Sequence, residues 1–433
     1  MNIPSPRDNL ASWLLLPGLI MSVGWGLRGF IGGGSLGAMI PGALVALAVC
    51  VLLGETGGRA ARAAAFGAVG IGFGGQETYG QTVQFLSRPE MLPLGLAGLG
   101  VKGAVWGLVG GACLGVGFAV RSRDRRFVLW ALGLLLVGTF LGWKFIDDPK
   151  LLYFSNRLDR PRAELWAGLL TGGGFFLGAL ACAGIARLPL RFALAGAVGA
   201  GIGFPLGGLV MLAGRLLPLD KSAYPGWKLM ELTFGLCFGV AIGACAYWNR
   251  RTLADVALEA APGKSTGARA ALLPAIVISL LASGIVWGAT RLPLRFDYTV
   301  AGVGLLGWAL FSERAAWQIA ITLTVGAFTL YNVELFRERF PSFLLLGWTV
   351  LAGTFWATSE LLVRWQNGCA HHVQRVVLLL LWVSVGASYW RSLLLESSGV
   401  AQLIVEFLFT ALAIAATLLV WRPRRALFST LRV

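Results

Sequence analysis

The feature of this sequence that most constrains its fold is a pattern of glycines that occurs twice. Two sets of three glycines have the same four-residue spacing and begin 128 residues apart: Gly107, Gly111 and Gly115, then Gly235, Gly239 and Gly243. Three further blocks recur in the same order: Gly24-Trp25 and Gly142-Trp143, Gly32-Gly33-Gly34 and Gly172-Gly173-Gly174, and Gly67-Ala68-Val69-Gly70 and Gly196-Ala197-Val198-Gly199. The shared order in an apolar chain indicates a duplicated unit, an arrangement common among membrane transporters.

The composition is that of a membrane protein. Hydrophobic residues make up 57% of the 433 residues and charged residues only 13%, whereas a soluble domain carries about 25% charge. Apolar stretches of about 20 residues recur along the whole chain, which indicates spanning helices rather than the short alternating strands of a membrane barrel. The predicted fold class is an all-α polytopic membrane protein with about 14 transmembrane helices.

The predicted spans follow from these apolar stretches. We expect them at residues 11–27, 36–54, 64–85, 94–120, 127–145, 164–186, 191–214, 227–248, 270–290, 298–312, 315–332, 342–363, 374–393 and 400–421. Most of the loop arginines then fall on one side, which the positive-inside rule assigns to the cytoplasm. The prediction is a protein integral to the cytoplasmic (inner) membrane, with both termini in the cytoplasm.

Glycine content divides the chain into regions. Most of the 60 glycines precede residue 269, and a polar stretch separates them from the rest. We expect two Gly-rich four-helix repeats (residues 1–126 and 127–252), a cytoplasmic linker (253–268) and a six-helix membrane region (269–433). Because each repeat has an even number of spans, both copies enter the membrane in the same direction. This predicts a pseudo-twofold axis along the membrane normal.

The glycines favour close helix packing. A glycine inside a helix costs about 1 kcal/mol relative to alanine, but in lipid its missing Cβ lets two helix backbones approach closely. We therefore expect the two glycine triplets to be helix-packing residues that face the interior of the bundle. The alternative role is to unwind a helix and free backbone groups for a ligand, for which Gly32–Gly34 and Gly70–Gly75 are the best candidates.

The most polar stretch predicted at membrane depth begins at Gln76 and ends at Gln84. A carboxylate there is costly unless it is paired or hydrated, which makes Glu77 a candidate functional residue. Helical spacing puts Glu77, Gln81 and Gln84 on one face. The repeat alignment also predicts that Lys102 faces Glu231. The candidate substrate-binding residues are Gln76, Glu77, Tyr79, Gln81, Arg28, Lys102 and Glu231. Structural ion pairs or snorkelling side chains are the alternative reading of these charges.

Signatures of metal, redox and enzyme chemistry are missing from the sequence. The two histidines, His371 and His372, are adjacent, so on a helix they point in different directions. None of the six cysteines forms a C-x-x-C pair. We therefore expect no metal, no cofactor and no catalytic residues. The net charge of +16 is assigned to contact with anionic lipid headgroups rather than nucleic acid.

Three functions remain open. The first is a transporter or permease for an unknown small solute, with a polar site between the two repeats and with Lys102 and Arg28 as countercharges. The second is a membrane-embedded enzyme acting on a lipid or lipid-linked substrate, with Glu77 or Glu231 as general base. The third is a non-catalytic subunit that docks another membrane protein through its C-terminal region.

Overall fold

The structure is a computed structural model, and the part that it describes is mostly helical and contains no strand. The described residues are 9–28, 34–55, 57–157, 161–214, 224–259, 272–274, 276–277, 297–321, 344–369, 371–394 and 399–421. Seven of the described helical segments are long and apolar enough to cross a bilayer: Leu10–Arg28, Pro89–Ala119, Ser122–Asp147, Arg187–Ala213, Gly226–Trp248, His372–Trp390 and Val400–Trp421. The chain is therefore an all-α membrane protein.

The long helices of the Gly-rich part overlap the predicted apolar segments, except that the segment 64–85 is divided between two helices. The helices of this part are α1 (Leu10–Arg28), α2 (Gly34–Leu53), α3 (Gly58–Gly74), the short α4 (Gly80–Phe85), α5 (Leu92–Ala119), α6 (Arg125–Gly142), α7 (Trp166–Cys182), α8 (Arg187–Ala213), α9 (Gly226–Trp248) and α10 (Arg250–Glu259). Helix α10 occupies the start of the stretch predicted as a linker. Two 3₁₀ turns (Pro89–Met91 and Ser122–Asp124) and a π-helical turn (Trp143–Asp147) complete this part.

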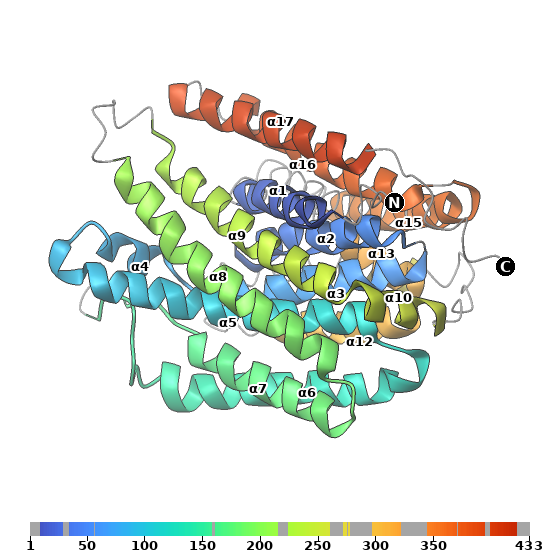
Figure 1. The fold of residues 1–433 in the computed structure, drawn as a ribbon, viewed down its shortest axis with the longest axis horizontal. Helices are drawn as coiled ribbons and strands as arrows, with labels where there is room; N and C mark the ends of the chain where they lie inside the picture. Colours follow the sequence, from blue (N-terminus) through green and yellow to red (C-terminus); the bar gives the residue numbers. More distant parts are fainter. Residues whose placement is uncertain are drawn as a thin grey trace, which may run out of the picture.

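The C-terminal part contains α12 (Asp297–Phe311), α13 (Glu313–Ile321), α15 (Leu344–Gly368), α16 (His372–Leu394) and α17 (Val400–Trp421). Most of the predicted span 270–290, and residues 322–332 of the span 315–332, lie outside the described residues. Helices α12, α13, α16 and α17 pack on α1, α2 or α3, and α15 packs on α13 and α16 (Figure 1).

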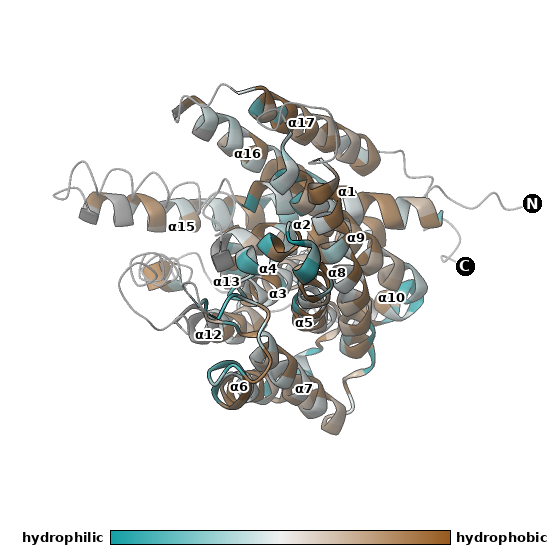
Figure 2. Cartoon of the chain, turned by 90° about the vertical axis from the view of Figure 1, so that its left-hand side faces the viewer, coloured by the Kyte–Doolittle hydropathy of each residue, from teal (hydrophilic) through white to brown (hydrophobic). Residues whose placement is uncertain are grey.

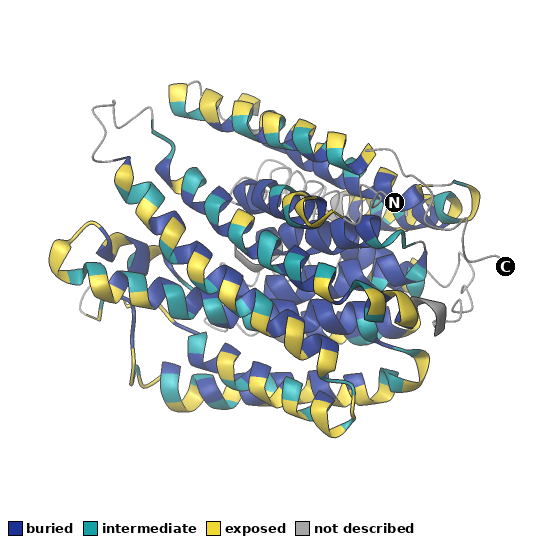
Figure 3. Cartoon of the chain, in the orientation of Figure 1, coloured by how far each residue is buried: buried dark blue, intermediate teal, exposed yellow. Residues whose placement is uncertain are grey.

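Six of the described helices close into a ring of three helix pairs, α1–α2, α3–α5 and α8–α9. The second helix of each pair packs against the first helix of the next, with α2 on α3, α5 on α8 and α9 on α1. Figure 3 shows the residues of α1, α2 and α3 as almost wholly buried. The seam between α5 and α8 is the most extensive helix contact in the described chain.

Glycines lie at all three seams of the ring. A Cβ added to Gly42 of α2 would overlap the carbonyl oxygen of Gly67 in α3. In the glycine triplet of α5, added Cβ atoms would overlap backbone atoms of α8, and in the triplet of α9 they would overlap backbone atoms of α1. The residues concerned are Gly107, Gly111 and Gly115, and Gly235, Gly239 and Gly243. Since any side chain would push these backbones apart, the glycines set the helix separation.

The neighbours of α6 and α7 differ from those of α1 and α2. The predicted pseudo-twofold axis makes these two pairs equivalent, but α1 and α2 each form a seam of the ring. The pair α6–α7 lies outside the ring, where α7 packs on α5 and α6 on α12. Burial follows this difference. In an apolar 18-residue window of each segment, 72% of the residues of Leu10–Arg28 are buried but only 33% of those of Ser122–Asp147. The packing of the two four-helix units is therefore not equivalent.

Apolar side chains cover the outer surface of α8. Six of them recur every three or four residues along one exposed face: Leu190, Leu194, Val198, Ile202, Leu206 and Leu209. Figure 3 shows the same alternation of exposed and buried positions along α6, α7 and α17. A continuous apolar stripe on a long helix is the surface expected to contact lipid.

The two ends of the bundle differ in their charges. The turns before α3, α6, α8 and α10 lie at one end, next to Arg59, Arg125, Arg187 and Arg250. We call this the arginine-rich end and the other the opposite end. The opposite end carries the α3–α5 connection, the ends of α6 and α8 and the starts of α7 and α9 (Figure 1). In Figure 2 the hydrophilic colour is strong at α4 and at α10, while most of the long helices are apolar.

Candidate functional site

The candidate site begins where α3 stops at the opposite end of the bundle. Helix α3 ends at Gly74, and α4 begins only at Gly80. The prediction of one helix over 64–85, with Glu77 and Gln81 on one face, is wrong for this reason. Several closely spaced glycines, the last being Gly75, give the chain little tendency to continue the helix. The break leaves the carbonyl of Thr78 free to accept a bond from a side chain.

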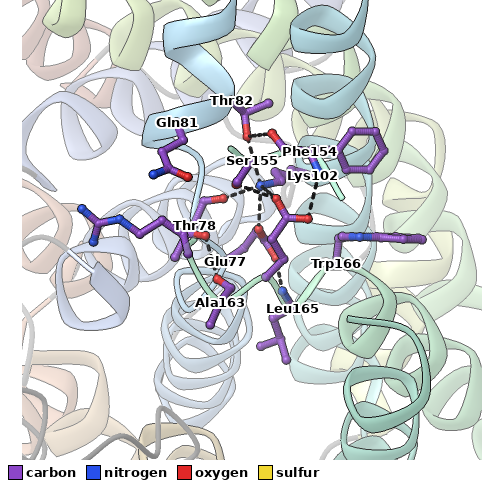
Figure 4. Close-up of polar contacts among 12 residues, drawn as sticks. Glu77, Thr78, Gln81, Thr82, Lys102, Phe154, Ser155, Ala163, Leu165 and Trp166 are labelled. Carbon is purple, nitrogen blue, oxygen red and sulfur yellow. Dashed lines mark hydrogen bonds and ion pairs between the residues drawn. The ribbon is translucent and has the colours of Figure 1, made fainter. Parts of the chain in front are cut away.

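Lys102 of α5 is the centre of the site (Figure 4). Its Nζ lies 3.1 Å from Oε1 of Glu77 and 2.7 Å from Oε1 of Glu164. It also donates hydrogen bonds to the carbonyl oxygen of Thr78 at 2.5 Å and to Oγ1 of Thr82 at 3.0 Å. The side chains of Lys102, Glu77 and Glu164 have no exposed surface. We call Glu77, Thr78, Thr82, Lys102 and Glu164 the polar cluster.

The N-terminus of α7 supports the carboxylates near Lys102. Oε2 of Glu77 accepts a hydrogen bond from the backbone N–H of Leu165 at 2.6 Å. Asp147 accepts two more, from Ala167 at 3.2 Å and from Gly168 at 2.9 Å. The positive end of the helix dipole and its free N–H groups favour negative charge at this position. The helix therefore offsets part of the charge of the buried acids.

The connection between α6 and α7 folds onto the polar cluster. Glu164 accepts hydrogen bonds from the backbone N–H of Phe154 at 3.0 Å and the hydroxyl of Ser155 at 2.7 Å. Thr82 donates to the carbonyl of Phe154 at 2.9 Å, and Thr78 donates to the carbonyl of Ala163 at 2.7 Å. These bonds tie the connection to the broken helix and close the cluster.

Two more side chains near the polar cluster form hydrogen bonds with backbone groups of the α6–α7 connection. Gln81 accepts a hydrogen bond from the backbone N–H of Asn156 at 3.2 Å. The hydroxyl of Tyr153 donates to the carbonyl of Arg162 at 2.7 Å. Burial and the neighbouring Glu164 carboxylate raise the pKa of Tyr153, because both disfavour a phenolate.

Arg28, at the end of α1, lies among aromatic rings. Its guanidinium carbon is 5.2 Å from the ring centre of Tyr79, 5.4 Å from Trp106 and 5.9 Å from Trp25. It also donates a hydrogen bond to the hydroxyl of Tyr79. Trp227 also stacks on Tyr79, with ring centres 5.9 Å apart. Tyr79 thus joins the broken helix to a buried cation held over aromatic faces.

Glu231 and Lys102 have different ion partners, so the prediction that they face each other is wrong. Oε2 of Glu231 lies 2.6 Å from Nζ of Lys228, which also donates to the carbonyl of Gly26 at 3.0 Å. The reason is the order of helices in the ring. Helix α8 lies between α5, which carries Lys102, and α9, which carries Glu231. The carboxylates that do lie beside Lys102 are Glu164 and Glu77, the latter a member of the site for which Lys102 was predicted as a countercharge.

Glu164 and Asp147 were missed by the sequence interpretation. Asp147 follows the predicted span 127–145, and Glu164 is the first residue of the predicted span 164–186, so neither was singled out as a buried charge. An available signal was Glu164 itself, an acid directly before an apolar run at the same end as Glu77. Gln76, which the sequence did select, has a buried side-chain nitrogen with no hydrogen-bond partner among the described residues.

The described residues contain no group of three or more His, Cys, Asp or Glu side chains placed to hold a metal ion. Comparison with protein-family models, curated proteins and solved structures finds no match for this chain. The fold and the site together define an all-helical membrane protein with buried charges beside a broken helix.

Proposed function

We propose that this protein is a transporter or permease for a small solute, and that the polar cluster is its binding site. The observation that carries this proposal is the helix break between Gly74 and Gly80, with Glu77 and Lys102 buried beside it. In membrane transporters, broken helices supply backbone groups to a ligand inside the bundle. Ionisable residues buried at such positions are costly and usually serve the transported solute or its coupling ion.

The charge of the polar cluster indicates what it binds. Two glutamates share one lysine, so with all three groups ionised the cluster carries one negative charge in excess. The α7 N-terminus offsets only part of that charge, and an uncompensated buried charge is strongly unfavourable. A bound proton or a cationic group of the solute would neutralise the remaining negative charge of the polar cluster. The unpartnered side-chain nitrogen of Gln76 would supply a hydrogen-bond donor nearby.

Duplication of a helix pair supports the transporter assignment. In the pair α3–α5, Gly70 packs on Cys113 and Gly74 on Trp106. In the pair α8–α9, at the corresponding repeat positions, Gly199 packs on Ala241 and Gly203 on Cys237 and Phe234. The shared register favours an origin of both pairs from one unit, as in repeat-built transporters. We infer that α1–α2 and α6–α7 were part of the same duplication and have since diverged.

We also infer the wider membrane arrangement from the sequence. The inferred arrangement has fourteen spans, with the arginine-rich end and both termini in the cytoplasm, in an inner membrane. The anionic headgroups of that leaflet would contact the loop arginines. The six-helix region 269–433 would be available to a membrane-protein partner.

The enzyme alternative has weaker support. It requires Arg28 and Lys102 to hold a phosphate group of a lipid substrate. The ammonium of Lys102 already has two carboxylates and two further oxygen acceptors, and Arg28 already donates to the hydroxyl of Tyr79. Glu77 is held by the same lysine and by the N–H of Leu165. These groups would have to exchange partners before they could act on a substrate.

The test is a ligand screen followed by uptake measurements. Purified protein is screened by thermal shift against small amines, amino acids, sugars and anions, and the solutes that stabilise it are followed into proteoliposomes. We expect Glu77→Gln to abolish both the stabilisation and the uptake. The matched control is Glu90→Gln, which changes an exposed glutamate at the same end of the bundle. Undiminished uptake by Glu77→Gln would place the binding site elsewhere.

A further inference from the structure

A second group of buried polar residues lies at the arginine-rich end, at the start of α3. The turn between α2 and α3 is held there by the C-terminal helices. The backbone N–H of Gly57 donates to Nε2 of His372 in α16 at 3.4 Å. A Cβ added to Gly57 would lie 2.7 Å from the side-chain nitrogen of Gln366, and one added to Gly58 would lie 2.9 Å from Oε2 of Glu313. Helices α13, α15 and α16 thus converge on this turn.

Four buried polar atoms at this place have no hydrogen-bond partner in the described structure. They are Nε of Arg62, Oε1 of Glu313, Nε1 of Trp317 and Oε1 of Gln366. The contrast with Trp106 is informative, because both tryptophans have no exposed surface. The indole N–H of Trp106 donates to the carbonyl of Ile71 at 2.7 Å, whereas that of Trp317 has no protein acceptor.

The four residues lie close together. The side chains of Gln366 and Glu313 reach the adjacent residues Gly57 and Gly58, and the carboxylate of Glu313 and the guanidinium of Arg62 attract each other. Trp317 follows Glu313 by four residues on α13, so both side chains lie on the same helix face. The ring of Trp317 meets that of His372 edge to face, with centres 6.4 Å apart.

Burial increases from the surface toward Trp317. Arg62, Glu313 and Gln366 are half-buried, while Trp317 is fully buried behind them. The unpartnered atoms comprise two donors, on Arg62 and Trp317, and two acceptors, on Glu313 and Gln366. Buried polar groups in proteins are nearly always hydrogen-bonded, to ordered water where protein partners are missing. Water can both donate and accept, so it matches this mixed set of atoms.

We propose that Arg62, Glu313, Gln366 and Trp317 line a water-filled chamber that opens at the arginine-rich end. This chamber is separate from the polar cluster, which lies at the other end of α3. It brings solvent inward along α13 as far as the indole N–H of Trp317. Hydration of this chamber does not depend on whether the polar cluster binds a solute.

Hydroxyl-radical footprinting of the purified full-length protein tests this chamber. Radicals formed from bound water oxidise adjacent side chains, including those with no exposed surface. We expect Trp317 to be oxidised about tenfold faster than Trp106, as a side chain beside trapped water, and at a rate near that of the exposed Trp248. A Trp317 as protected as Trp106 would overturn the proposal.

Two variants at Glu313 test whether water reaches Trp317 through this chamber or by another route. Glu313→Gln keeps the shape and polarity of the lining, so Trp317 should stay as reactive as in the unaltered protein. Glu313→Leu removes the polar acceptors beside the opening, and oxidation of Trp317 should fall to the level of Trp106. Oxidation of Trp106 serves as the internal check that each variant is folded. Equal labelling of Trp317 in two folded variants would contradict the chamber.

Discussion

Lys102 and Glu164 lie 2.7 Å apart, although 62 residues separate them in the sequence. One belongs to α5 in the ring of helices, and the other precedes α7 outside the ring. Their contact, together with the Lys102–Glu77 contact, joins α5, the broken end of α3 and the α6–α7 connection at a single ammonium group. The geometry of the proposed binding site therefore depends on one lysine.

Replacement of that lysine is expected to destabilise the protein strongly. Lys102→Met leaves Glu77 and Glu164 buried without their cation, and removal of one partner from a buried ion pair costs about 3–5 kcal/mol. The free energy of unfolding in mixed micelles measures the loss. The control is Lys144→Met, which breaks the Lys144–Asp148 ion pair. The two side chains of that pair are 51% and 44% exposed, and an exposed pair contributes about 1 kcal/mol or less to stability. Similar losses in the two variants would argue against a charged cluster.

The double variant Lys102→Met, Glu164→Gln provides a further check on the same prediction. Removing one carboxylate charge along with the ammonium restores part of the balance, so the double variant should be more stable than Lys102→Met alone. If the two changes simply add, the residues do not interact.

The glycine triplets are expected to tolerate no side chain. Gly111→Leu would drive a side chain into the backbone of Phe192 in α8, and Gly239→Leu would do the same at Pro17 in α1. Either change should abolish recovery of folded protein, because it forces apart two helices of the ring. Gly133→Leu is the control, since a Cβ at that position meets nothing within 4 Å. Size-exclusion profiles after membrane extraction distinguish these outcomes.

Asp147 is expected to stabilise the first turn of α7. Asp147→Ala removes the acceptor for the N–H groups of Ala167 and Gly168, and loss of such a cap costs about 1 kcal/mol. Hydrogen exchange at these two amides should become faster. The neighbouring Asp148→Ala is the control, because Asp148 is half exposed and bonded to Lys144. Exchange rates unaffected by Asp147→Ala would rule out the capping role.

Arg28 is expected to need its planar guanidinium as well as its charge. Arg28→Lys keeps the charge but loses the flat contact with Trp25, Tyr79 and Trp106, which is worth about 1–2 kcal/mol for a desolvated cation. The unfolding temperature should therefore fall. Arg125→Lys, which changes a guanidinium 5.6 Å from the single ring of Phe311, should have a smaller effect. A fall of equal size in both variants would show that the ring contacts at Arg28 are not special.

Much of the fold was predictable because local sequence determines it. Apolar runs located most of the long described helices, although not the break after α3, and the glycine triplets identified positions of close packing. Both signals depend only on nearby residues. The partner of each triplet was not predictable. Gly107 packs on α8 and Gly235 on α1, yet the same spacing fits any helix with a small-residue face. The order of helices in the ring depends on the whole chain. Alignment of the two repeats alone gave the wrong neighbours, because it placed Lys102 opposite Glu231.

The candidate site was predictable in part for the same reason. Glu77 was identified because a carboxylate in an apolar setting is conspicuous, and its neighbour Gly75 belongs to a stretch selected as a place where a helix unwinds. Glu164 was missed because it is the first residue of the predicted span 164–186, where a carboxylate can still face the polar connection that precedes the span. Its burial arises only when the connection folds over Lys102, and no local pattern encodes that step.

The closure of the ring between α9 and α1 has a consequence for the synthesis of the chain. The hydroxyl of Ser22 donates to the carbonyl of Leu232 at 2.8 Å, across 210 residues of sequence. At cellular translation rates, that length takes roughly ten to forty seconds to complete. During this time the face of α1 that packs on α9 in the folded protein lacks that partner in the bilayer. The nascent protein must keep its first helix in a provisional lipid or insertase environment until its ninth arrives.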